Sequence, residues 1–166
     1  MIGMSAAVTI RDLKDGERAW ANDLYRAIRF ATTPPEAVAL VAEIASPGSA
    51  GARSTPAGSA ESINGERIGL GRLVAHAPDV LELGGIWTDE AVRGRGIARA
   101  MVDALLARRA ATPHPERLWC IPFAHLSAFY QSCGFALRAP PWPPSIAAKV
   151  SHCIEDGLDE VVVLVR

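Results

Sequence analysis

Hydrophobic and polar positions change their period in the middle of the chain. Residues 80–88 form a mostly apolar run that ends at polar Thr88 and predicts a buried strand. From Ile97 to Leu106, apolar residues recur every three or four positions, which predicts a helix. Between the two lies the short loop Arg-Gly-Arg-Gly-Ile-Ala, residues 93–98. Strand, glycine loop and helix therefore follow one another directly.

The same reading of the remaining chain predicts a series of interleaved strands and helices. Residues 38–44 fit either type of element, and their valines favour a strand. Residues 46–62 are rich in Gly, Ser, Pro and Ala, which predicts a flexible loop inside one domain over 1–166. The alternation favours a mixed α/β (α+β) sandwich around one sheet. Strands are expected over 7–11, 38–44, 67–75, 118–121, 135–137 and 160–165, and helices over 14–29, 97–110, 126–133 and 145–155.

Composition narrows the classes of function. The chain has 166 residues, of which 49% are hydrophobic and 21% charged, as in soluble globular domains. A formal net charge of −1 offers no broad basic surface, so we expect neither nucleic acid nor a membrane as partner. No signal-peptide pattern or membrane-length apolar run is present. The three cysteines lack metal-binding spacing, which favours reduced thiols, no metal and a cytoplasmic protein.

The loop at 93–98 has the composition of a phosphate-binding loop. Its glycines let main-chain N–H groups approach a ligand, and the first turn of the following helix offers unpaired donors. The nucleotide-binding P-loop pattern is absent because no lysine follows a glycine here. The dinucleotide pattern G-x-G-x-x-G fits Gly94 and Gly96 but fails at Arg99. A strand–helix turn without a ligand is the alternative interpretation.

Two motifs together identify a family. Residues 93–98 match the pattern Arg/Gln-x-x-Gly-x-Gly/Ala, which resembles the pyrophosphate-binding motif of the GCN5-related N-acetyltransferases (GNAT). Residues 119–135 resemble the second acetyl-CoA motif of this family, in which a short helix carries Phe129-Tyr130 and ends at Gly134-Phe135. The resemblance covers roughly residues 67–137. It implies acetyl-CoA as co-substrate, a primary amine of a small molecule or peptide as acceptor, and direct acetyl transfer.

The resemblance also implies a fold and a set of roles. The fold is a twisted, mostly antiparallel sheet of six to seven strands, with helices on both faces and a gap between two splayed parallel strands. Tyr130 matches the family's general acid, and Glu82 is the candidate general base; a core aromatic and a salt-bridged glutamate are the alternatives. The expected cofactor-binding residues are Ile86, Trp87, Thr88, Arg93, Gly94, Arg95, Gly96, Ile97, Ala98, Arg99 and Phe129.

Some features leave alternatives open. Glycine inside a strand marks a bulge or a close backbone approach, so Gly84-Gly85 either lines the cofactor gap or makes room for a helix. Phe123 stands where the family often has Asn, and His125 could be a cap, a cofactor contact or a relay. A catalytically silent acyl-CoA-binding module would carry the same motifs. The resemblance leaves a homodimer open.

Overall fold

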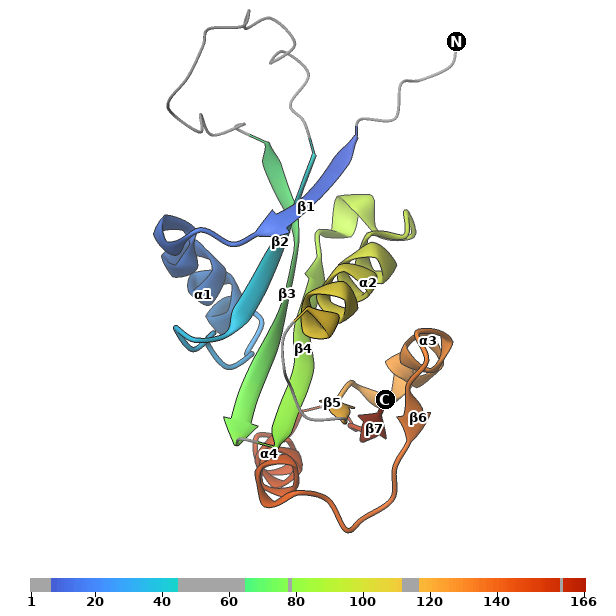
Figure 1. Cartoon of the computed structure of the whole chain (residues 1–166). Helices are drawn as coiled ribbons and strands as arrows, with labels where there is room; N and C mark the ends of the chain where they lie inside the picture. The colour runs from blue at the N-terminus through green and yellow to red at the C-terminus, as the bar shows by residue number, and fades with distance from the viewer. Residues whose placement is uncertain (1–6, 45–64, 78, 112–116, 159) are drawn as a thin grey trace, which may run out of the picture.

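The computed structural model describes residues 7–44, 65–77, 79–111, 117–158 and 160–166, and these form one seven-stranded sheet. The strand order is β1-β2-β3-β4-β5-β7-β6, and every neighbouring pair is antiparallel except β4 and β5 (Figure 1). The strands are β1 (Val8–Asp12), β2 (Val38–Ile44), β3 (Glu66–Ala77), β4 (Val80–Thr88), β5 (Leu118–Cys120), β6 (Ala136–Leu137) and β7 (Leu164–Val165).

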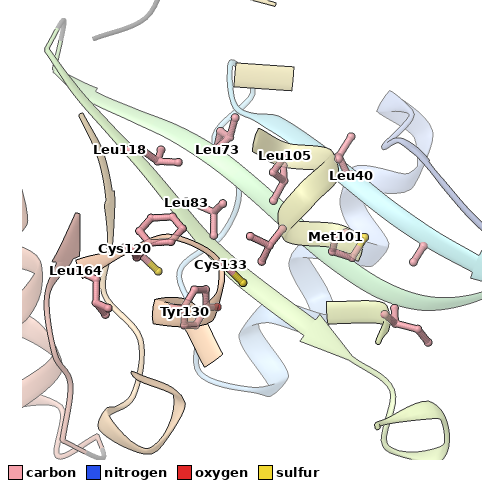
Figure 2. Packing of buried hydrophobic residues seen from close by; sticks show 14 of the residues in the cluster. Leu40, Leu73, Leu83, Met101, Leu105, Leu118, Cys120, Tyr130, Cys133 and Leu164 are labelled. Carbon is pink, nitrogen blue, oxygen red and sulfur yellow. The ribbon is translucent and has the colours of Figure 1, made fainter. Parts of the chain in front are cut away.

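Helices cover both faces of this sheet, as the resemblance implied. The α-helices are α1 (Arg18–Ala27), α2 (Ile97–Ala110), α3 (Ser127–Ser132) and α4 (Pro144–Glu155), and the 3-10 turns are η1 (Asp15–Glu17), η2 (Glu90–Val92) and η3 (Ala124–Leu126). Side chains of α2 and α3 join one apolar cluster with Leu83 and Leu118 (Figure 2). α1 packs on Leu70, and α4 packs on Val80 and Trp119, on the opposite face. The mixed, mostly antiparallel fold predicted from the sequence is confirmed.

The two parallel strands separate after a short contact. β4 and β5 pair only through Leu81–Leu118 and Glu82–Trp119. Beyond Glu82, β4 continues to Thr88 without a strand partner on that side in the described part of the chain. The splay that the resemblance implied is therefore present between these two strands.

A bulge in β4 lies where the strands separate. Between the pairs Arg72–Gly84 and Leu70–Trp87, β3 advances two residues and β4 three, so β4 holds one extra residue. Gly85 has φ +62°, a conformation that favours glycine, and its carbonyl accepts a hydrogen bond of 2.7 Å from the Tyr25 hydroxyl. Gly84-Gly85 thus forms a bulge.

Two predicted elements differ from the observed ones by more than a few residues. The helix expected over 14–29 begins as the 3-10 turn η1 and becomes α-helical only at Arg18. The terminal strand expected over 160–165 is regular only in β7, with a single bridge between Val161 and Phe123 before it. Pro122 explains the interruption, because it accepts from Val162 N but has no N–H to donate to a ladder. The predicted loop at 46–62 lies outside the described residues.

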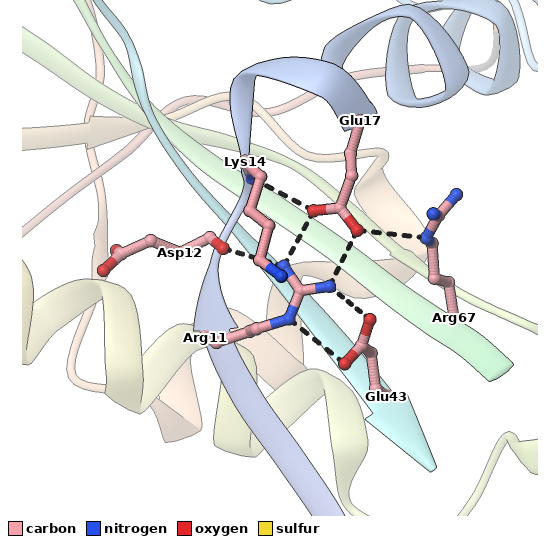
Figure 3. Close-up of polar contacts among 6 residues, drawn as sticks. All are labelled: Arg11, Asp12, Lys14, Glu17, Glu43 and Arg67. Atoms are coloured by element: carbon pink, nitrogen blue, oxygen red, sulfur yellow. Dashed lines mark hydrogen bonds and ion pairs between the residues drawn. The ribbon is translucent and has the colours of Figure 1, made fainter. Parts of the chain in front are cut away.

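An ionic network joins the first three strands to η1 (Figure 3). The Arg11 guanidinium donates to both carboxylate oxygens of Glu17, each at 2.7 Å, and also bonds Glu43 of β2. Arg67 of β3 lies 3.3 Å from Glu17 Oε1. The hydrogen bonds from Arg11 lower the pKa of Glu17 to about 2 despite its partial burial. We expect this network to hold the edge strand β1 and the start of α1 in place.

None of the helices in the described residues combines the length and apolar character needed to cross a membrane. All three cysteines lie in the described residues and none forms a disulfide. Burial raises the pKa of the Cys120 thiol, so this side chain behaves as part of the core.

Candidate active site

The glycine loop leads from β4 through η2 into the first turn of α2. Gly94 and Gly96 both have φ +78°, and Gly96 is the residue that caps α2 without a side-chain hydrogen bond. No described atom lies within 4 Å of the place where a Cβ would stand on either glycine. Buried Ile97 anchors the helix start in the core. The first main-chain N–H groups of α2 therefore border open space, which suits an anionic group.

The three arginines of this loop are exposed but differ in their contacts. Arg93 lies 3.2 Å from Glu90 Oε1, across one turn. Arg99 lies 3.5 Å from Asp103 and donates from Nη1 to Ser132 Oγ at 3.0 Å. Ser132 belongs to α3, the helix of the second motif, so Arg99 connects the two sequence motifs directly. Arg95 has no ion-pair partner in the described part of the chain.

Tyr130 lies on α3 with its ring inside the core below α2 (Figure 2). It is 5% exposed, and its ring meets those of Phe129 and Phe135 edge-on, with centroids 5.0 and 6.1 Å away. Its hydroxyl makes no hydrogen bond to a described residue. Burial raises the pKa of Tyr130 well above its ordinary value, so the phenol stays protonated at neutral pH.

Residues 86–88 form the end of β4 beyond the bulge. All three are half-buried, and they lie along the part of the strand that has separated from β5. The main-chain groups on that edge are therefore free of sheet hydrogen bonds and available to a ligand in the splay.

Glu82 occupies the last paired position before the splay, on the face opposite to Tyr130. It is 2% exposed, and its neighbours in β4, Leu81 and Leu83, point to the α2 face instead. His76 Nε2 lies 2.5 Å from Glu82 Oε2, and Lys149 of α4 bonds Oε1. Burial by itself would raise the pKa of Glu82, but the hydrogen bond to His76 and the charge of Lys149 outweigh it and lower the pKa.

Several polar residues at the splay were not found by sequence reasoning. They are Tyr25, Thr33, Arg72, His76 and Lys149. Arg72 could have been found in the same way as Glu82, because both are charged residues in the middle of an apolar strand. His76 and Lys149 carry no local signal, since only the fold brings them to Glu82.

Phe123 and His125 lie in and before η3. Their rings stack with centroids 5.8 Å apart, and Phe123 also contacts Phe30 at 6.3 Å. Phe30 in turn stacks on Tyr25 at 6.2 Å. This row of rings reaches from the β4 bulge to the segment after β5. Phe123 thus forms an aromatic contact where the family often has an amide.

A separate hollow of about 310 Å³ lies between β6, the segment leading to β7, and α4. Its lining includes Leu137, Arg138, Trp142 and Val150, and it contains none of the residues predicted for the site.

A parallel strand pair that splays beside a glycine- and arginine-containing helix start defines the class of acyl-CoA N-acyltransferases. Residues 59–137 match the family model of the acetyltransferase (GNAT) domain. The fold of the described residues agrees with that match, since solved structures that share it include N-acetyltransferases. No curated protein sequence matches the chain significantly.

Solved structures of the same fold include three useful comparisons. N-acetylglutamate synthase from Neisseria gonorrhoeae, complexed with coenzyme A and N-acetyl-glutamate, has a TM-score of 0.66 and 14% identity over 98% of this chain. The match covers 35% of that protein, so the present chain corresponds to about a third of it. Escherichia coli ElaA has a TM-score of 0.64 and 15% identity, over 96% of this chain and 99% of its own. Rv2747 from Mycobacterium tuberculosis, in a complex that includes CoA, has a TM-score of 0.60 and 15% identity over 95% and 97%. At these identities the likeness concerns the fold.

Proposed function

We propose that the protein is an N-acetyltransferase that moves an acetyl group directly from acetyl-CoA to the primary amine of a small molecule or peptide. One observation carries the proposal: the open glycine loop and Tyr130 stand beside the same strand splay and are connected through Arg99 and Ser132. The family match and the coenzyme A present in two structural neighbours support it.

In this proposal the loop residues hold the pyrophosphate of the cofactor. The main-chain N–H groups at Gly96, Ile97 and Ala98 donate to it, and Arg93, Arg95 and Arg99 supply positive charge around it. The loop fits such a group because both glycines border open space and no side chain caps the helix. Phe129, half-buried on α3, would border the arm of the cofactor.

The end of β4 would orient the thioester. Along residues 86–88, Ile86, Trp87 and Thr88, the main-chain N–H groups that point to the splayed edge would donate to its carbonyl, where negative charge develops during attack. The unpaired edge is what makes these donors available, because a regular strand would use them in a ladder.

Tyr130 would donate a proton, or a strong hydrogen bond, to the departing thiolate. Its raised pKa keeps the phenol protonated but makes full proton transfer less favourable, since an efficient acid has a pKa near the working pH. We therefore expect a contribution near the low end of the range for general acids.

Glu82 would accept the proton of the amine. Its lowered pKa makes it a weak base by itself. His76, which touches Glu82 and is partly exposed, offers the proton a path from the buried carboxylate toward solvent. Glu82 and Tyr130 act from opposite faces, so the acceptor and the cofactor would meet in the splay.

A catalytically silent acyl-CoA-binding module is the second candidate. The observation in its favour is that both carboxylate oxygens of Glu82 already have partners, His76 and Lys149, as a purely structural glutamate would. Release of coenzyme A from acetyl-CoA in the presence of pooled amines separates the two: turnover requires the enzyme, and binding without turnover indicates the module.

The cofactor site is tested by two substitutions at Gly96. Gly96→Ala and Gly96→Glu share the strain of a side chain at φ +78°, but only the glutamate adds negative charge. Calorimetry with coenzyme A should give a Kd at least about tenfold higher for Gly96→Glu than for Gly96→Ala. Equal affinities in two folded variants would remove the loop from the proposed site.

A further inference from the structure

Arg72 is a buried cation at the point where the sheet splays. It pairs with Gly84 across β3 and β4, and its exposed fraction is 5%. Its Nε would lie 3.1 Å from a Cβ added to Gly85, so the guanidinium lies directly beside the bulge. The side chain comes from the face of the sheet that also carries Glu82 and α1, opposite to Tyr130.

The positive charge of Arg72 has no counter-ion within ion-pair distance in the described residues. Nη1 donates to Thr33 Oγ1 at 2.8 Å, and the guanidinium lies 4.4 Å from the centroid of the Tyr25 ring. Within the described residues no carboxylate forms an ion pair with it, and its other N–H groups make no hydrogen bond. Burial of a charge is costly unless the charge is paired and hydrogen-bonded.

The nearest carboxylate on this face is already engaged. Glu82 uses one oxygen for His76 and the other for Lys149. The face thus holds the buried cation Arg72 and the partly exposed cation Lys149 against the single carboxylate of Glu82, so its local charge is positive even with His76 neutral. An anionic group entering from the splay would complete the hydrogen bonding of Arg72 and balance this charge.

We propose that the acceptor is an amine that also carries a carboxylate, as an amino acid does, and that Arg72 binds this carboxylate. The proposal rests on the proposed function and assigns the substrate class of the same site. A guanidinium matches a carboxylate with paired N–H donors, and such charge-assisted contacts are stronger than neutral ones. The rings of Tyr25, Phe30 and Phe123 border the same face and would limit the acceptor to a molecule that passes beside them.

Matched acceptors test the proposal on the unaltered protein. Each amino acid is compared with its amide and with the amine left after loss of the carboxyl group, at saturating acetyl-CoA, by coenzyme A release. The best carboxylate-bearing acceptor should exceed its two relatives by roughly 100-fold in kcat/KM, since they lack the charged partner. Equal or faster turnover of the amides or amines would overturn the assignment and leave the acetyltransferase function intact.

Substitution of Arg72 tests whether this residue makes the contact with the acceptor carboxylate. Arg72→Met should lower kcat/KM for the amino acid by roughly 100-fold and abolish its advantage over the amide. Arg72→Lys should recover part of the loss, because lysine keeps the charge but not the paired donors. The control is Arg26→Gln, which removes an exposed arginine of α1 that pairs with Asp23, and this variant should behave as wild type.

The affinity for coenzyme A and the acetylation of acceptors together distinguish a failure of the Arg72 assignment from a failure of the proposed acetyltransferase function. Arg72→Met should keep the wild-type Kd for coenzyme A, because Arg72 lies on the face opposite the loop helix α2. Should that variant not fold, the matched acceptors on the unaltered protein still decide the question. A protein that neither binds coenzyme A nor acetylates any acceptor would contradict the proposed function itself, and this inference with it.

Discussion

Tyr130 and Glu82 are both buried and ionisable, yet they differ in how their polar atoms are satisfied. Glu82 is bonded by two cationic or potentially cationic partners, whereas the Tyr130 hydroxyl has no partner in the described part of the chain. A hydroxyl that the fold leaves without a partner is available to a ligand. Because the Tyr130 hydroxyl has no hydrogen-bond partner in the described residues, we expect it to interact with a substrate and not only to pack in the core.

Tyr130→Phe removes this hydroxyl and keeps the ring. Because the hydroxyl contributes no hydrogen bond to the fold, the melting temperature and the Kd for coenzyme A should stay close to wild type. The value of kcat for the best acceptor should fall by roughly 100-fold, near the low end for a general acid. Steady-state kinetics with several acceptors measures this, under conditions in which chemistry limits the rate.

The chain offers a matched control at its other tyrosine. Tyr25→Phe removes a hydroxyl that donates to Gly85 O at 2.7 Å, so this variant should lose about 1 kcal/mol of stability. A rise in the KM for acetyl-CoA with unchanged kcat in Tyr130→Phe would make the hydroxyl a cofactor anchor. A kcat within about threefold of wild type would contradict the acid role.

At the scale of elements, one glycine lets α2 lie close to the sheet. A Cβ on Gly71 of β3 would stand 2.7 Å from Ile86 Cδ1 and 3.1 Å from Leu105 Cδ1. Gly71→Ala therefore forces the side chains of half-buried Ile86 in β4 and buried Leu105 in α2 apart, and overpacking of this kind costs about 1–3 kcal/mol. Urea unfolding should reveal a loss of that size.

Gly16→Ala is the control for this substitution. Nothing lies within 4 Å of a Cβ at Gly16, so the added methyl group should leave the stability unchanged or slightly raised. If Gly71→Ala proves as stable as Gly16→Ala, then Ile86 moves away without cost and α2 does not depend on the small residue.

Local patterns predicted most elements because each apolar face has one clear period. β4 has the bounds expected for 80–88, and α2 begins at Ile97 directly after the glycine loop. The terminal strand was overestimated, since its regularity depends on whether a partner can donate, and Pro122 cannot. The glycine loop and Tyr130 could be located because they lie in continuous motifs. The contacts of Glu82 with His76 and Lys149 could not be predicted from the sequence. They depend on the bulges between β3 and β4 and on the packing of α4 against the sheet.

At the scale of the whole molecule, the network around Glu17 gives the stability a dependence on pH. Hydrogen bonds from Arg11 lower the pKa of Glu17 from 4.5 to about 2. A lowered pKa means that the stabilisation is complete above the unfolded value of about 4.5 and is lost as the pH falls through about 2. Glu17→Gln should cost about 1–2 kcal/mol at neutral pH, discounted for partial exposure.

This prediction is checked by urea unfolding of wild type and Glu17→Gln at several pH values. The difference between them should be constant from about pH 7 to pH 5 and should shrink below that. Asp23→Asn breaks an exposed pair with Arg26 and should change the stability by less than about 0.5 kcal/mol at every pH. A difference that grows as the pH falls would mean that Glu17 is not held as a carboxylate.

The two faces of the sheet are covered by different stretches of the chain. The loop helix α2 and the Tyr130 helix α3 lie on one face. The other face is covered by α1 and α4 and carries the side chain of Arg72 from β3. Mutations that alter one face can accumulate without touching the other. Under the proposed function, a lineage or a protein engineer could therefore exchange the residues of α1 and the following segment to redirect the acceptor preference, while the acyl-donor site is inherited unchanged.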